Sequence, residues 1–157
     1  LATPATFQGA LYTSVVERFG AGVEFFQNTC PGLVGQIEKG ELESNATRTI
    51  LDDALLPMLE KNIDTVVLGC THYPFVIPLI ERIVGANVRV IDPAPSVARQ
   101  VKRLLEADGK MNQTSESLRV QFYTSADPDS MKSLLPLLLG TDGEVEAVTW
   151  KDDQVTL

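Results

Sequence analysis

Apolar side chains recur every three or four positions along several stretches of the chain, a spacing that predicts amphipathic helices. The first such stretch covers residues 7–19. A second stripe runs through residues 44–59, where Ser44 is placed to cap the helix and Pro57 predicts a kink or an early end. The same reasoning predicts helices at residues 31–38, 74–84, 95–105 and 127–139.

Short uninterrupted apolar runs mark the predicted strands. Residues 65–68 form such a run, which is typical of a parallel strand covered on both faces. Leu1 and Ala2 are interpreted as the end of another strand, and further strands are predicted at residues 23–26, 88–91, 120–123 and 145–148. Because strands and helices alternate with short links, the pattern predicts right-handed βαβ units and an α/β fold with a parallel sheet flanked by helices.

The part of the chain after residue 92 carries three further predictions. Residues 92–95, Asp-Pro-Ala-Pro, are the most proline-dense point of the chain, so a change of lobe is expected there. Residues 108–117 are polar and are predicted to form a loop. The helix that starts near Pro95 is expected to face inward through Val97, Val101, Leu104 and Leu105.

Composition narrows the class of protein. The chain has 157 residues, of which 44% are hydrophobic and 22% charged, a globular profile with room for one domain or two small lobes. Its net charge of −8 argues against a nucleic-acid-binding surface, and no apolar run approaches the roughly 20 residues needed to span a bilayer. Cys30 and Cys70 alone make a poor disulfide framework, so a reduced, cytoplasmic protein is expected.

The candidate chemistry lies in the stretch DTVVLGCTHYP, residues 64–74, which holds the only histidine two positions after Cys70. Ligands of open parallel sheets bind beyond the carboxyl ends of the strands, and a following helix start favours anions and thiolates. A neighbouring imidazole can exchange protons near neutral pH. Two interpretations of Cys70 stay open at this point: an activated thiol, or a small buried hydrophobe. Cys30 is interpreted as structural, and a structural zinc site lacks ligands.

Several segments resemble one enzyme family. The motif VVLGCTHYP resembles the second cysteine motif of glutamate racemases. Four more segments resemble family segments in the same order: LATPAT, CPGLVGQIEKGE, LLP and FYTSADPDSMKSL. The resemblance covers essentially the whole chain, and the nine-residue motif is its specific part.

The resemblance implies a fold and a reaction. It implies two α/β lobes that face each other across a glutamate-binding cleft, and racemisation of L-glutamate to D-glutamate for peptidoglycan synthesis without any cofactor. One thiol from each lobe would exchange the α-proton on opposite faces of the substrate. Residues 1–92 would form the second lobe, complete or nearly so, and residues 93–157 would return to the first lobe.

The resemblance also implies roles for individual residues. Cys70, His72 and Glu38 match the catalytic positions, with Glu38 the weaker match. Thr71 and His72 match residues that contact substrate, and Thr3 and Thr6 match threonines that line the carboxylate site; turn and cap chemistry remains an alternative for these two. Aspartate racemases of similar fold usually carry a glutamate after Cys-Thr, so His72 points to glutamate as the substrate.

One departure from the family pattern limits the expected activity. The Asp-Ser-Gly opening and the first Cys-Asn-Thr segment of the family do not occur in this sequence, so the chain is expected to be the latter part of a racemase. A single thiol cannot serve both faces of the α-carbon, and we expect the chain alone to racemise poorly or not at all. An exposed sheet edge would favour a homodimer. A non-catalytic module that binds an amino acid or a protein, and a Cys-His hydrolase, remain alternatives.

Overall fold

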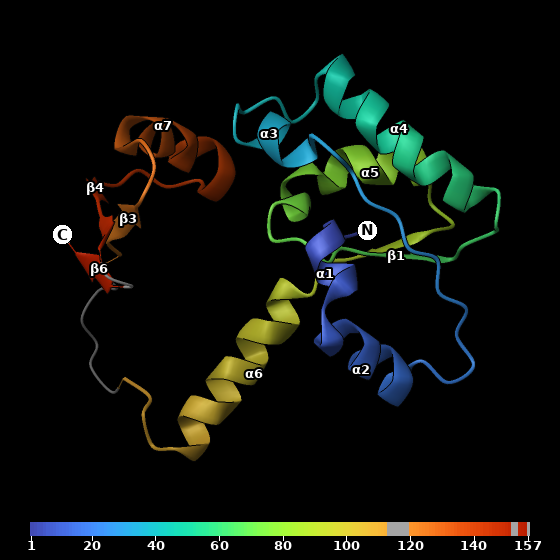
Figure 1. Cartoon of the computed structure of the whole chain (residues 1–157), viewed down its shortest axis with the longest axis horizontal. Coiled ribbons are helices and arrows are strands. Elements are labelled where there is room, and N and C mark those ends of the chain that lie inside the picture. The colour runs from blue at the N-terminus through green and yellow to red at the C-terminus, as the bar shows by residue number, and fades with distance from the viewer. Residues whose placement is uncertain (113–119, 152–153, 157) are drawn as a thin grey trace. The chain divides into compact units, whose positions relative to one another are not determined.

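The computed structural model describes residues 1–112, 120–151 and 154–156, and the chain divides into two compact units (Figure 1). The first unit is Leu1–Met111 and the second is Asn112–Leu157. Each unit has its own parallel strand pair, and the predicted α/β class with a parallel sheet is confirmed. The predicted loop at residues 108–117 lies outside the described residues from residue 113 onward.

The sheet of the first unit is centred on β1, Thr65–Val67, which pairs in parallel with β2, Arg89–Ile91. Both strands match predicted runs. On the other edge of β1, the Leu1 amino group donates to the Val67 carbonyl oxygen at 2.8 Å and the Gly69 N–H donates to the Leu1 oxygen at 2.7 Å. Ala2 forms an isolated parallel bridge with Gly69, so Leu1 and Ala2 lie alongside the end of β1.

Gly69 allows this close approach of the two strands. A Cβ atom at Gly69 would lie 2.9 Å from the Cβ atom of Ala2 and 3.4 Å from the Leu1 oxygen. Real Cβ atoms essentially never come as close as the first of these distances, so a side chain here would push Ala2 away from the sheet.

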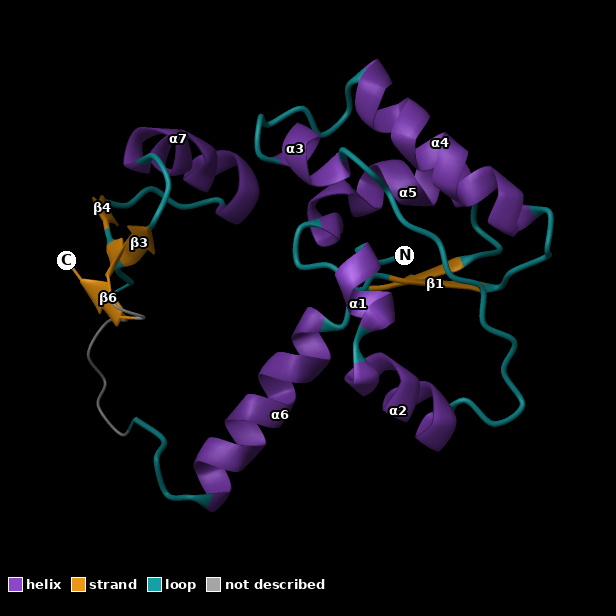
Figure 2. Ribbon diagram, viewed as in Figure 1, coloured by secondary structure: helices purple, strands orange, loops and turns teal. Residues whose placement is uncertain are grey.

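Three helices cover one side of this sheet, and Figure 2 shows them as a layer. They are α3 (Leu33–Ile37), α4 (Asn45–Leu59) and α5 (Ile77–Val84). Their apolar faces form the core with the strand, and fully buried members are Leu33, Ile37, Leu51, Leu55, Leu68 and Ile80. The predicted Ser44 cap is confirmed, because its hydroxyl accepts from the Thr47 N–H at 3.2 Å, and α4 continues past Pro57.

The other α-helices of the first unit are α1 (Pro4–Gln8), α2 (Ala10–Phe19) and α6 (Ala94–Ala107). Figure 2 shows α2 and α6 on the other side of the strands. The single helix predicted at residues 7–19 is wrong in its start, because Gly9 has an extended backbone that separates α1 from α2.

The inward face predicted for α6 is also wrong. The side chains of Val97, Val101, Leu104 and Leu105 are between 38% and 60% exposed. An apolar stripe predicts that one face of a helix can be buried, but burial also requires a second element that packs against that face.

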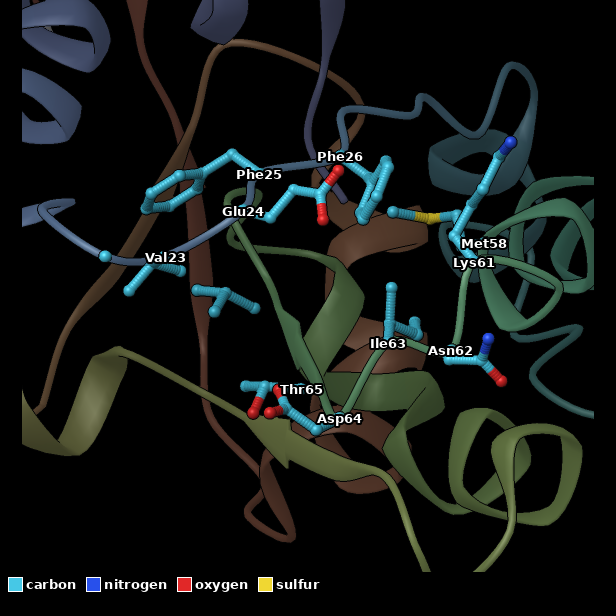
Figure 3. Close-up of a pocket in the computed structure, with 12 residues that line it drawn as sticks. Val23, Glu24, Phe25, Phe26, Met58, Lys61, Asn62, Ile63, Asp64 and Thr65 are labelled. Carbon is cyan, nitrogen blue, oxygen red and sulfur yellow. The ribbon is translucent and has the colours of Figure 1, made fainter.

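The strand predicted at residues 23–26 is not formed. The Ala2 N–H donates to the Asn28 oxygen at 3.2 Å, which joins this segment to the sheet just after the predicted strand. Farther from this bond, a groove of about 460 Å³ separates residues 23–26 from residues 63–65 (Figure 3). Leu1 and Ala2 reach along β1 only as far as Val67, so residues 23–26 have no described strand beside them with which to form a ladder.

The second unit has its own strand–helix–strand arrangement. β3, Phe122–Thr124, pairs in parallel with β4, Val145–Ala147, and α7, Pro128–Leu139, connects them in the sequence. Asp127 caps α7, because its carboxylate accepts from the Ser130 N–H at 2.9 Å. An antiparallel pair that the sequence pattern does not predict follows, formed by β5 (Thr149–Lys151) and β6 (Gln154–Thr156). No helix within the described ranges is long and apolar enough to cross a membrane.

Candidate active site

Three residues that carry a hydroxyl, a thiol or a carboxylate lie at the carboxyl ends of three neighbouring parallel segments of the sheet. Thr3 follows Ala2, Cys70 follows the bridge residue Gly69, and Asp92 follows β2. Because the strands are parallel, their carboxyl ends meet at one edge of the sheet, where open α/β sheets bind ligands. The backbone topology therefore gathers these residues at one edge.

The turn after β1 presents Cys70 ahead of a short 3₁₀ helix. The Tyr73 N–H donates to the Cys70 oxygen at 3.2 Å and closes the turn. His72 precedes η1, Tyr73–Val76, which leads into α5, so the helix predicted from Pro74 starts as a 3₁₀ turn. Cys70 is a free, partly exposed thiol, in contrast to the buried interpretation that the sequence left open.

A cavity of about 530 Å³ opens beside this turn. Cys70 and Thr71 line it together with residues that follow β1 and β2, one residue of η1 and residues at the start of α6: Leu68, Gly69, Pro74, Asp92, Pro93, Ala94, Val97 and Ala98. Cys70 thus lines a space of a size that suits a small molecule, and the surrounding side chains are mostly apolar.

Asp92 is a member of this cavity that the sequence analysis did not single out. Its carboxylate accepts from the Ala94 N–H at 2.9 Å and begins α6. The available signal was an acidic residue directly after a predicted strand, in a segment interpreted only as a lobe boundary.

His72 and Glu38 form the second group of predicted site residues. The Nε2 atom of His72 lies 3.3 Å from Oε1 of Glu38, and the two side chains are 34% and 60% exposed. Glu38 directly follows α3, and His72 directly precedes η1, so the contact joins these two packed elements. A carboxylate at this distance can fix the orientation of the imidazole ring.

Thr3 and Thr6 form the third group. Their hydroxyl oxygens lie 3.1 Å apart, with Thr3 just before α1 and Thr6 inside it. These two residues, like His72 and Glu38, are not among those that line the Cys70 cavity. The structure therefore places the six predicted residues in three groups, of which only Cys70 and Thr71 share the cavity.

Cys30 and Tyr73 lie buried next to this site. Cys30 is 5% exposed and Tyr73 is 1% exposed. Burial raises the pKa of the Cys30 thiol to about 11, and burial raises the pKa of the Tyr73 hydroxyl well above its ordinary value. Cys30 is therefore neutral near pH 7, which agrees with its structural interpretation.

Metal ligands are not grouped in the part of the chain that the structure describes. Within those ranges, no three His, Cys, Asp or Glu side chains come together in a way that could hold an ion.

The fold and this edge define an α/β protein with a thiol and an imidazole at the carboxyl ends of parallel strands. Residues 1–101 match the family model of the Asp/Glu/Hydantoin racemases. Since this match covers most of the sequence, the chain belongs to the Asp/Glu/Hydantoin racemase family.

Individual relatives point to one branch of that family. The chain is 41% identical to the glutamate racemase of Pseudomonas aeruginosa strain UCBPP-PA14 over 145 residues, which cover 92% of this chain and 54% of that protein. It is 44% identical to the glutamate racemase of Pseudomonas entomophila over 143 residues, or 88% of this chain and 52% of that protein. The chain thus spans about half the length of these curated relatives.

Solved structures agree with this relationship. Glutamate racemase isoform RacE1 from Bacillus anthracis superimposes with a TM-score of 0.83 at 25% identity, over 94% of this chain and 55% of that one. The Francisella tularensis glutamate racemase, solved in complex with D-glutamate, gives a TM-score of 0.81 at 28% identity over the same shares. The predicted glutamate-racemase resemblance and racemase-like fold are therefore confirmed.

Proposed function

We propose that this chain carries one thiol half of a cofactor-independent glutamate racemase site, acting in D-glutamate supply for peptidoglycan synthesis. The observation that carries the proposal is the free, partly exposed thiol of Cys70 at a cavity beyond the carboxyl ends of β1 and β2. The relatives named glutamate racemase, and the Francisella tularensis structure that holds D-glutamate, support glutamate as the substrate.

Each predicted residue has a definite role in this proposal. The Cys70 thiolate removes or returns the α-proton on one face of glutamate, and a second thiol acts on the opposite face. His72 exchanges the proton with Cys70, and Glu38 orients the imidazole, which the 3.3 Å contact supports. The hydroxyl of Thr71 donates to a substrate carboxylate.

Thr3 and Thr6 complete the proposed carboxylate site. Their hydroxyls lie at the same sheet edge as Cys70, because Ala2 and Gly69 are bridged. A pair of hydroxyls 3.1 Å apart can donate to the two oxygens of one carboxylate when each turns toward the ligand.

The chain by itself is proposed to lack the second base. Cys30 is buried and its pKa is raised to about 11, so it does not supply a thiolate near neutral pH. We therefore infer that the isolated chain exchanges the α-proton on one face only and racemises poorly or not at all. In the same proposal, residues 1–92 form the second lobe and residues 93–157 return to the first.

The proposal also includes the cellular location of the chain and its self-association. Both cysteines are free, which supports a reducing, cytoplasmic location. The apolar stripe of α6, at Val97, Val101, Leu104 and Leu105, is exposed and supports self-association as a homodimer.

A second candidate is a module that binds an amino acid without turnover, which is favoured by the observation that His72 and Glu38 do not line the Cys70 cavity. Protection of Cys70 from alkylation tests whether glutamate occupies the site in either case. We expect saturating L- or D-glutamate to slow iodoacetamide labelling of Cys70 several-fold, while succinate at the same concentration has a smaller effect. Glutamate binding with no protection of Cys70 would contradict the proposed site.

A further inference from the structure

We propose that Asp92 binds the α-ammonium group of an amino acid in the Cys70 cavity, so that this site selects α-amino acids over matching acids that lack the amine. The inference rests on the proposed function in one respect, since it takes the Cys70 cavity as the ligand site. It does not depend on glutamate being the ligand or on proton transfer by the thiol.

The charges around the cavity favour a ligand with a positive group. Among the described residues that line it, Asp92 supplies the one carboxylate, and none is a lysine or an arginine. The remaining lining side chains are mostly apolar. An ammonium group that enters such surroundings loses water and needs an anionic partner, and Asp92 is the partner that this cavity offers.

The Asp92 carboxylate is held through one oxygen and available through the other. Its Oδ1 atom accepts from the Ala94 N–H at 2.9 Å at the start of α6. Its Oδ2 atom makes no hydrogen bond or ion pair with any residue in the described ranges. A carboxylate can accept several hydrogen bonds, so Oδ2 can receive an N–H of a ligand while Oδ1 keeps the cap. The side chain is half-buried, which limits competition from water.

The sheet brings Asp92 near the position that the reacting carbon would occupy. β1 and β2 are paired up to Val67 and Ile91, and the Leu68 N–H donates to the Ile91 oxygen at 3.0 Å, so the ladder continues to the residue before Asp92. Neighbouring strands lie about 4.8 Å apart, so groups that follow β1 and β2 can reach one small ligand. In an amino acid the ammonium nitrogen is bonded to the α-carbon, whose proton Cys70 exchanges in the proposed function.

The experiment measures how well matched ligands protect Cys70 from iodoacetamide. Glutamate is compared with glutarate, which has the same carbon chain and both carboxylates but no amine. In the native protein, we expect glutamate to halve the labelling rate at a concentration about ten-fold or more below that of glutarate, as for a hydrogen bond between charged groups. In Asp92→Asn, the value for glutamate should rise to about that of glutarate, whose own value should stay within about two-fold.

The choice of variants separates the charge of Asp92 from its capping role. Asparagine keeps an oxygen that can accept from the Ala94 N–H, and Asp92→Ser, which also keeps a capping oxygen, should lose the same selectivity. Asp127→Asn is the matched control. Asp127 caps α7 in the second unit through a 2.9 Å bond from the Ser130 N–H, so its change alters charge and cap outside the cavity. It should leave both protection values unchanged.

A second ligand pair separates this inference from the glutamate assignment. Norvaline and pentanoate share a five-carbon chain and one carboxylate, and differ only in the amine. Protection by norvaline but not by glutamate, with a preference over pentanoate that Asp92→Asn removes, would contradict the glutamate proposal and support the role of Asp92. An unchanged preference for the amine-bearing ligand in both Asp92 variants would overturn the inference and leave the glutamate site standing. No preference in the native protein, or no protection by any of the four ligands, would also overturn it.

Discussion

The Nε2 atom of His72 lies 3.3 Å from Oε1 of Glu38, and this contact ties the turn that carries Cys70 to the end of α3. It brings together two residues that the family resemblance matches to catalytic positions. The spacing of apolar residues along the chain could not predict this contact. The contact is exposed, so its energetic contribution is small and its chemical contribution is orientation of the imidazole.

Removal of the Glu38 charge tests that contribution. Glu38→Gln is expected to slow alkylation of Cys70 at pH 7 by roughly two- to five-fold, because the His72 imidazole loses the carboxylate that orients it and an exposed pair contributes at most about 1 kcal/mol. The rate is measured with iodoacetamide and mass spectrometry. Glu43→Gln, which removes a carboxylate 2.8 Å from Arg82, is the control and should leave the rate unchanged. Equal rates in native and Glu38→Gln proteins would argue against the orienting role.

The close approach at Gly69 makes a stability prediction. Gly69→Ala is expected to lower the free energy of unfolding by about 1–3 kcal/mol, because the new Cβ atom would meet the Cβ atom of Ala2 at 2.9 Å. Gly35→Ala is the matched control, since a Cβ atom there meets nothing within 4 Å and the residue lies inside α3. The control should stabilise by up to about 1 kcal/mol. Urea unfolding of both variants gives the comparison, and a neutral Gly69→Ala would contradict the described strand contact.

Burial of Cys30 predicts how stability changes with pH. The folded thiol has a pKa of about 11 against an ordinary 9.0, so the unfolded chain ionises first as pH rises. Below pH 9, the buried neutral thiol makes its full contribution to the free energy of unfolding. This contribution, up to about 2 kcal/mol, is lost as the pH rises from about 9 to 11.

The raised pKa of Tyr73 adds a loss of the same sign at higher pH. Thermal unfolding at several pH values checks this, and Cys30→Ser should flatten the first part of the curve. A melting temperature that stays constant from pH 8 to 11 would be inconsistent with the buried thiol.

The exposed stripe of α6 predicts self-association. Val101→Glu combined with Leu104→Glu should shift the protein toward monomer in sedimentation velocity, because charges replace two apolar side chains that are 50% and 55% exposed. The melting temperature of the monomer should change little, since neither side chain is buried. A native protein that sediments as a monomer at every concentration would count against the homodimer.

Local signals in the sequence account for much of the fold. The Ser44 cap and the apolar run that became β1 each depend on a few neighbouring residues, and both are confirmed. The pattern at residues 23–26 is equally typical of a strand, yet these residues form no ladder. A ladder forms only where a partner strand lies alongside. Strand formation is decided by neighbours in space, and periodicity cannot supply them.

The candidate site divides in the same way. The cysteine–histidine spacing marks Cys70 and His72 because both lie in one short segment, and the resemblance adds Glu38. The place of Asp92 in the Cys70 cavity, and the burial of Cys30 and Tyr73, depend on segments that only the folded chain brings together. Sequence spacing therefore identifies the candidate thiol and imidazole, while the side chains around them are identified only from the folded structure.

Hydrogen–deuterium exchange at the α-carbon of glutamate tests the central claim most directly. The chain is incubated in D₂O with L-glutamate and, separately, with D-glutamate, and the loss of the α-proton signal is followed by NMR beside chiral analysis of the product. We predict exchange into one enantiomer with little inversion, abolished by Cys70→Ala and retained in Cys30→Ser. No exchange into either enantiomer, or exchange that persists in Cys70→Ala, would contradict the assignment of Cys70 as the proton-transferring thiol.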